Sequence, residues 1–243
     1  MNFSVSGPEV RFTIPIFGGI KVTETIVNSW VIMAVITLVC IWLTRGLSVR
    51  NPSKKQIVAE KLVTMVYDLV KDVMGEKYIR FVPYIGTLFT MSIISSLSGL
   101  VGMRAPTADL STTLAWALVT FVMVQVNNIK HNGIIGYLTG FAKPVPFLLP
   151  INIVSEIANP ISISFRHFGN IASGIVITGL VYGALAALSA AILQFIPVEF
   201  INTIPIFQAG LPALLSIYFD VFTSFLQAYI ICMLTMVFVS SAE

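Results

Sequence analysis

Long uncharged stretches alternate with short polar segments along this chain. Residues 25–44, 81–103 and 110–129 contain no Asp, Glu, Lys or Arg. At about 1.5 Å per residue, a helix of this length crosses about 30 Å of hydrocarbon. We therefore predict a transmembrane helix in each of the three stretches, preceded by an external polar tail over residues 1–24.

Two later stretches are too long for one perpendicular span. Among Asp, Glu, Lys and Arg, residues 145–196 contain only Glu156 and Arg166, and residues 206–242 contain only Asp220. A turn rich in proline and polar residues separates the two stretches at 197–205. We expect them to form a long, tilted helix hairpin in the membrane.

Residues 45–80 follow a different pattern. Eight Lys and Arg residues alternate here with apolar residues such as Val58, Leu62, Val66 and Val70, at three- to four-residue spacing. This pattern is typical of an amphipathic helix that lies at a membrane surface. The chain is therefore expected to be an all-α integral membrane protein, a single membrane domain over 1–243 with about five to six helices.

Composition supports the membrane and excludes other classes. The chain is 56% hydrophobic and 10% charged, with a mean hydropathy of +0.91, whereas globular domains contain about 25% charged residues. A net charge of +3 gives no support for nucleic-acid binding. Neither a nucleotide-binding motif nor a familiar hydrolase motif occurs, so we expect no cofactor, no metal and no catalytic nucleotide site in this chain.

The distribution of Lys and Arg predicts the orientation. Residues 45–80 hold eight of them and residues 130–143 hold two, whereas residues 1–24 hold two and the loop at Arg104 holds one. Cytoplasmic segments carry an excess of Lys and Arg. We therefore place the N-terminus outside and the C-terminus in the cytoplasm.

Arg166 is the first candidate for a functional residue. A charge inside hydrocarbon costs roughly 2.5 to 3.5 kcal/mol, and polar residues recur every three or four positions around this one, which places them on one helix face. This polar stripe consists of Ser155, Asn159, Ser162, Arg166, Asn170 and Ser173. Arg166 either serves ion movement or is a structural charge paired with Glu156 or Asp220.

A second polar stripe lies in the last stretch, at Ser216, Asp220, Thr223 and Gln227. Two such stripes on consecutive helices predict a common path for ions, since an unpaired carboxylate in apolar surroundings needs a partner, water or a proton. The Ser and Asn residues are alternatively explained as interhelical hydrogen-bonding groups. Asp109, which precedes the third span, is either a helix cap or part of the path.

Residues 159–171 have the sequence Asn159-Pro-Ile-Ser-Ile-Ser-Phe-Arg166-His-Phe-Gly-Asn170-Ile. This segment resembles the P-x-S-x-x-x-R-x-F-G-N signature of subunit a of bacterial F-type ATP synthases. The resemblance extends to Pro106–Leu110 and to Gln227-Ala-Tyr229. It differs at three positions, because His167, Ile175 and Asn152 stand where relatives usually have leucine, a His or Glu, and a glutamate.

The resemblance implies a stator subunit beside a rotating ring of c subunits in a bacterial inner membrane. Two half-channels would carry H+ or Na+ to the ring, with Arg166 between them and Asn170, Gln227 and Asp220 among their polar positions. Thr223, Ser162, Asn159, Glu156 and Asp109 complete the expected ion path. The implied partners are the c-ring, the peripheral stalk subunit b, the F1 catalytic head through that stalk, and the lipid bilayer.

Two other functions compete with this interpretation. A secondary transporter or ion channel acting alone would use the same polar stripes, although the sequence contains no inverted repeat. A membrane enzyme would need a nucleophile at a recognisable spacing from Asp220 or His167, and the sequence offers none.

Overall fold

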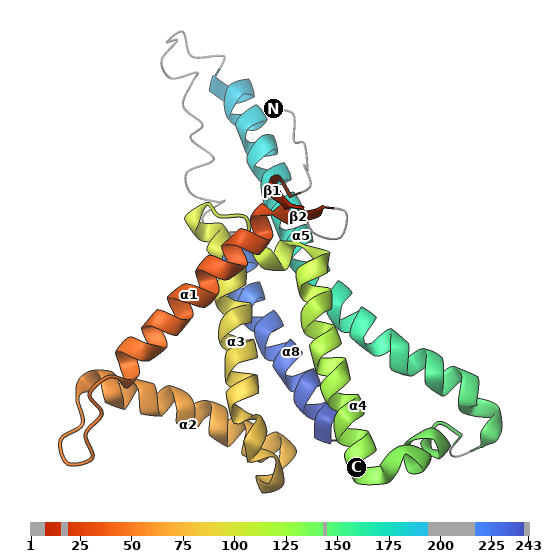
Figure 1. The fold of residues 1–243 in the computed structure, drawn as a ribbon. Helices are drawn as coiled ribbons and strands as arrows, with labels where there is room; N and C mark the ends of the chain where they lie inside the picture. The colour runs from red at the N-terminus through yellow and green to blue at the C-terminus, as the bar shows by residue number, and fades with distance from the viewer. Residues whose placement is uncertain (1–7, 16–18, 143–144, 194–216, 241–243) are drawn as a thin grey trace.

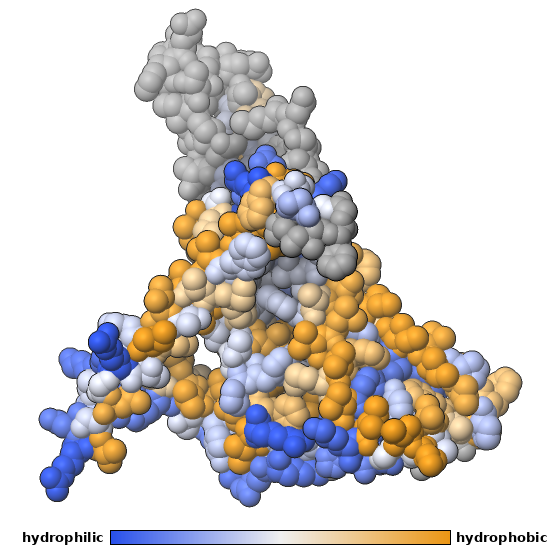
Figure 2. Space-filling view, viewed as in Figure 1, coloured by the Kyte–Doolittle hydropathy of each residue, from blue (hydrophilic) through white to orange (hydrophobic). Residues whose placement is uncertain are grey.

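The computed structural model describes residues 8–15, 19–142, 145–193 and 217–240, and most of them are helical (Figure 1). Five helical segments are long and apolar enough to cross a membrane: Glu24–Thr44, Glu76–Val101, Leu110–Gly140, Pro146–Ser189 and Asp220–Ser240. This architecture confirms the predicted all-α membrane fold. Apolar side chains cover much of the visible flanks of these helices, as a lipid-facing surface requires (Figure 2).

The predicted polar tail contains a small sheet. β1 (Val10–Ile14) pairs antiparallel with β2 (Ile20–Thr23), with Val10 opposite Thr23 and Ile14 opposite Ile20. β2 leads directly into α1 (Glu24–Thr44), and the Glu24 N–H donates to the Glu9 carbonyl at 2.9 Å. The hairpin therefore fixes the entry to the first span.

The amphipathic segment folds as α2 (Lys54–Met74), which Ser53 caps by accepting a hydrogen bond from the Gln56 N–H. α2 connects the lower end of α1 to that of α3 (Figure 1). Val70 and Met74 on its inner side are buried, whereas Leu62 and Val63 are exposed. A short 3₁₀ helix, η1 (Glu76–Phe81), then turns the chain into α3 (Val82–Leu97).

Two 3₁₀ helices, η2 (Ser98–Val101) and η3 (Pro106–Ala108), lead from α3 into α4 (Leu110–Gly140). α4 continues past the expected end of its span at residue 129. The helix kinks at Gly133, whose φ of 69° suits glycine because other L-residues rarely adopt it. Residues 130–133 therefore continue this helix beyond the predicted apolar span.

The first of the two C-terminal stretches forms the longest helix among the described residues. After η4 (Pro146–Leu148), α5 (Leu149–Leu193) runs for 45 residues with Pro160 inside it. At 1.5 Å per residue this is more than twice the length that the hydrocarbon thickness requires. The π-helical turn η6 (Ile217–Phe222) leads into α8 (Thr223–Ser240). The predicted turn at 197–205 lies outside the described residues, as do residues 194–196 of the first arm and residues 206–216 and 241–242 of the second.

The core lies where α2, α3, α4, α5 and α8 meet. Its buried apolar residues are Val70, Met74, Tyr78, Ile85, Leu88, Ala117, Ile163, Ile231, Cys232, Met236 and Val239. Small hydroxyl residues let the helix backbones approach closely, which is the usual packing inside membranes. One example is the contact between Thr120 of α4 and Thr235 of α8, with 3.4 Å between their hydroxyl oxygens.

Asn127 ties three helical segments together at the C-terminal end of α8. Arg80 Nη2 donates to Asn127 Oδ1 at 3.0 Å, and Asn127 Nδ2 donates to the Val239 carbonyl at 3.1 Å. Val239 lies in the last turn of α8, where helix carbonyls lack an intrahelical partner. Asn127, only 3% exposed, therefore caps α8 from the neighbouring helix α4.

We predict that Asn127→Leu destabilises the protein by about 1 to 3 kcal/mol, because it leaves a buried carbonyl and the Arg80 guanidinium without their partner. The measurement is the thermal unfolding midpoint of the purified chain in detergent, which is expected to fall by several degrees. Asn132→Ala, at an exposed position on the same helix, is the control. An unchanged midpoint for Asn127→Leu would show that this cap does not contribute to the stability of the protein.

Candidate functional site

Arg166 lies on the outward side of α5. Its side chain is exposed, as is Ser162 one turn before it, and Asn170 one turn after it is half-buried. Between described residues, the two ion pairs are Arg11–Glu24 at 3.6 Å and Lys71–Glu76 at 2.8 Å, and no hydrogen bond engages Arg166. The structural-pair interpretation of Arg166 therefore receives no support, and its guanidinium faces the surroundings of the chain.

The inward side of α5 is fixed by polar contacts. His167 is 1% exposed, with Nε2 3.5 Å from Ser92 Oγ of α3 and its ring edge-on to Trp116 of α4 at 6.0 Å between centroids. Ser164 Oγ lies 3.1 Å from Thr113 Oγ1 of α4. These contacts set the rotation of α5 about its axis. Because residue 166 is about 100° from residue 167 on a helix, Arg166 cannot share that buried face.

The second stripe is only partly exposed. Asp220 lies in the π-turn η6, and Thr223 begins α8 and donates to the Tyr218 carbonyl at 3.1 Å. Both side chains are half-buried, whereas Gln227 is only 4% exposed. α5 packs against both η6 and α8. Ser216 lies outside the described residues; the other three residues of the second stripe lie on segments that adjoin α5 and pass from the surface into the interior.

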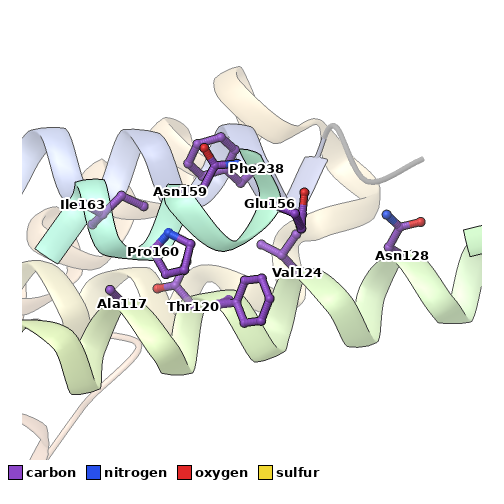
Figure 3. A pocket seen from close by; sticks show the side chains of 10 residues that line it. Ala117, Thr120, Val124, Asn128, Glu156, Asn159, Pro160, Ile163 and Phe238 are labelled. Carbon is purple, nitrogen blue, oxygen red and sulfur yellow. The ribbon is translucent and has the colours of Figure 1, made fainter. Parts of the chain in front are cut away.

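Glu156 and Asn159 line a cavity of about 130 Å³ between α4, α5 and α8. In Figure 3 these residues of α5 lie across from Thr120, Val124 and Asn128 of α4. The Glu156 carboxylate accepts a hydrogen bond from Gln125 Nε2. A cavity of this size holds several water molecules, and its polar lining gives them hydrogen-bonding partners.

Asp109 lies apart from this cavity. It precedes α4 at the N-cap position, and its backbone carbonyl accepts from the Thr112 N–H at 3.2 Å. Its side chain makes no capping bond and instead accepts from Thr25 Oγ1 of α1 at 2.9 Å. The expected position at the start of α4 is thus observed, but the carboxylate joins α1 to α4.

Sequence reasoning missed the contribution of α4. Thr120, Val124 and Asn128 recur at four-residue spacing and form one wall of the cavity, and Gln125 contacts its carboxylate. The signal was present, since three amide residues (Gln125, Asn127 and Asn128) interrupt an otherwise apolar span near its end. Their spacing indicates a shared face for some of them, but it does not say which helix that face meets.

Comparisons with known proteins agree on one family. The family model described as ATP synthase A chain matches residues 26–240. ATP synthase subunit a 2 of Bradyrhizobium sp. (strain BTAi1) is 37% identical over 226 residues, which cover 93% of this chain and 91% of that relative. A protein of Propionigenium modestum described as "ATP synthase subunit a, sodium ion specific" is 29% identical, over 98% of this chain and 86% of its own length.

The two faces of α5 are distinguishable by thiol labelling. We predict that Ser162→Cys reacts with a water-soluble maleimide in membranes that contain the chain, whereas Ser164→Cys does not, because the thiolate forms only where water reaches it. The background variant Cys40→Ser removes an exposed thiol, and the buried Cys232 is retained. Equal labelling of the two positions would contradict the assigned rotation of α5.

Proposed function

This chain belongs to the ATP synthase A chain family, and from that membership we propose that it is the ion-translocating stator subunit of a rotary ATP synthase. It is a multi-pass membrane protein by its five apolar helices. In this proposal, two half-channels bring ions to a ring of c subunits from opposite sides of the membrane. Ions then cross the membrane only while they are bound to the ring, whose rotation drives ATP formation.

Arg166 is the observation that carries the proposal. Its guanidinium is always protonated and lies on the outward side of α5, on the face that a neighbouring ring would meet. A fixed positive charge there favours the ionised form of a passing ring carboxylate and promotes release of its ion. The same charge blocks direct leakage between the half-channels.

The polar groups on either side of Arg166 lie toward opposite ends of α8. The cavity with Glu156 and Asn159 includes Phe238, near the C-terminal end of α8, whereas Asp220 and Thr223 lie at its beginning. Along α5, Asn159 and Ser162 precede Arg166 and Asn170 follows it. We assign Glu156, Asn159 and Ser162 to one half-channel. The other half-channel is assigned Asn170, Asp220, Thr223 and Gln227. Asp109, bonded to Thr25, is assigned to the outer rim of the second path.

The proposed orientation follows the distribution of Lys and Arg: the N-terminus is outside and the C-terminus is in the cytoplasm of a bacterium. The partners in this arrangement are the c-ring, the peripheral stalk subunit b and, through that stalk, the F1 catalytic head. The driving energy is about 2.3 kcal/mol per charge per 100 mV, so several ions must pass for each ATP formed. The transported ion is H+ or Na+. Family membership argues against a transporter or channel that acts alone.

Arg166→Ala is expected to reduce ATP-driven ion uptake to background in vesicles that contain the purified whole complex. ATP hydrolysis by the detached catalytic head should persist, since the variant leaves the nucleotide sites untouched. Arg50→Ala, an exposed arginine before α2, is the control and should leave uptake unchanged. Retained pumping by Arg166→Ala would refute the role assigned to this residue.

Asp220→Asn is expected to slow ATP-driven uptake severalfold without preventing assembly, because the amide keeps the hydrogen-bonding capacity of this position but cannot take up or release a proton. The measurement is uptake as a function of pH, with subunit content checked on a gel. Asp68→Asn on α2 is the matched control. If Asp220→Asn leaves both the rate and its pH dependence unchanged, Asp220 has no relay role.

A further inference from the structure

Four basic residues, called the basic corner below, lie where α1 meets α2. Arg45 is the C-cap residue of α1, and the others lie in the first half of α2: Lys54, Lys55 and Lys61. None of the four forms an ion pair with another described residue. Glu60 is the one acidic residue between Arg45 and Lys61 in the chain. The positive charge of the basic corner is therefore balanced only in small part by this segment itself.

Hydrogen bonds give the basic corner a fixed shape. Gln56 is 6% exposed, and its Oε1 accepts from the Ser48 N–H at 2.9 Å while its Nε2 donates to the Ser48 carbonyl at 3.0 Å. Lys55 Nζ donates to the Arg45 carbonyl at 2.7 Å and lies 5.8 Å from the centre of the Trp42 ring. These contacts hold the end of α1 against the start of α2, so the basic side chains start from fixed positions.

The sequence of α1 places the basic corner at the depth of the lipid headgroups. Near its end, α1 exposes the apolar side chains of Leu38, Ile41 and Trp42, and the first charge after them is that of Arg45. Tryptophan is enriched at the boundary between hydrocarbon and water. Phospholipids carry their phosphate at this boundary, and Lys and Arg bind phosphate through charge-assisted hydrogen bonds.

An apolar face of α2 lies beside these charges. Val58, Leu62 and Met65 follow one another at intervals of four and three residues, which places them on one side of the helix. Each of these side chains is more than half exposed. Lys54 and Lys61 stand four residues before Val58 and Met65, so they border this face. The surface therefore combines positive charge with exposed apolar side chains on both α1 and α2.

We propose that the basic corner binds an anionic phospholipid. The lipid phosphate lies among the four basic side chains, and the acyl chains follow the exposed apolar residues of α1 and α2. An acidic segment of a soluble protein would match the charges but not the apolar surface beside them. Figure 2 shows hydrophilic residues at the lower left, where Figure 1 places the connection between α1 and α2, next to apolar residues of α1.

This site does not depend on the proposed ion path, because none of its residues belongs to the polar stripes of α5 and α8. In the proposed orientation it faces the cytoplasmic leaflet. Basic segments next to a membrane span are attracted to the anionic lipids of that leaflet. A failure of the lipid site would therefore leave the role proposed for Arg166 unchanged.

The test uses the full chain in phosphatidylcholine vesicles with increasing fractions of phosphatidylglycerol whose acyl chains are brominated. Bromine quenches a tryptophan that it contacts, so Trp42 reports the lipid at the basic corner. Trp42→Phe gives the background from the other two tryptophans, and vesicles with brominated phosphatidylcholine give the reference. We expect phosphatidylglycerol to associate at Trp42 at least about tenfold more strongly than phosphatidylcholine.

Lys54→Gln and Lys61→Gln are each expected to lower this preference about fivefold, because each removes one charge near the phosphate. Lys61→Gln removes no hydrogen bond or ion pair between described residues, so it serves if another variant fails to fold. Lys130→Gln, which removes the same charge from an exposed position on α4, is the matched control. A preference that also falls as sodium chloride is added supports a site based on charge.

Three results would overturn the site. One is equal association of the two lipids at Trp42. A second is a loss in Lys130→Gln as large as that in Lys54→Gln, because the preference would then follow net charge alone. The third concerns the assembled complex, compared with and without Trp42→Phe. Quenching of Trp42 in the isolated chain but not in the complex would show that a partner subunit, rather than a lipid, covers the basic corner.

Discussion

A charge inside hydrocarbon is costly unless it meets water, an opposite charge or a proton, and this constraint organises the C-terminal half of the protein. The described part of the helix hairpin contains three such charges, Glu156, Arg166 and Asp220. Glu156 lines a cavity and is held by Gln125. Arg166 is exposed on the outer side of α5, and Asp220 is half-buried in a π-turn. Each lies where water or a partner can reach it.

The packing of the helices keeps these charges in place. Ser164 and His167 turn one side of α5 toward α3 and α4, where Thr113 and Ser92 contact them. Such small polar contacts are individually modest inside a membrane, but they are directional and therefore fix the rotation of a helix. With the inner side of α5 fixed, Arg166 is held outward. The function proposed for Arg166 thus depends on residues that lie outside the proposed ion path.

Different polar groups lie toward the two ends of the molecule. Near the C-terminal end of α8, Asn127 caps the helix and the cavity collects carboxylate and amide groups. At the other end, Asp109 accepts a hydrogen bond from Thr25 and joins the first span to α4. The β-hairpin that leads into α1 lies near the start of α4 (Figure 1). In the proposed function, polar groups toward these two ends belong to separate half-channels, and Arg166 between them prevents ions from crossing directly.

The sequence by itself determined the membrane class, the spans, the amphipathic helix and the stripe around Arg166, because these depend on hydrophobic length and helical period, which are local properties. The sequence pattern did not predict the β-hairpin in the polar tail. It also placed the end of the third span at residue 129, whereas α4 continues to Gly140. Only the tertiary structure decided that His167 faces inward, that Asp109 binds Thr25 and that Gln125 meets Glu156. Periodicity says which residues share a face of one helix. It contains no information on which neighbour that face meets, because the choice depends on packing between segments far apart in the chain.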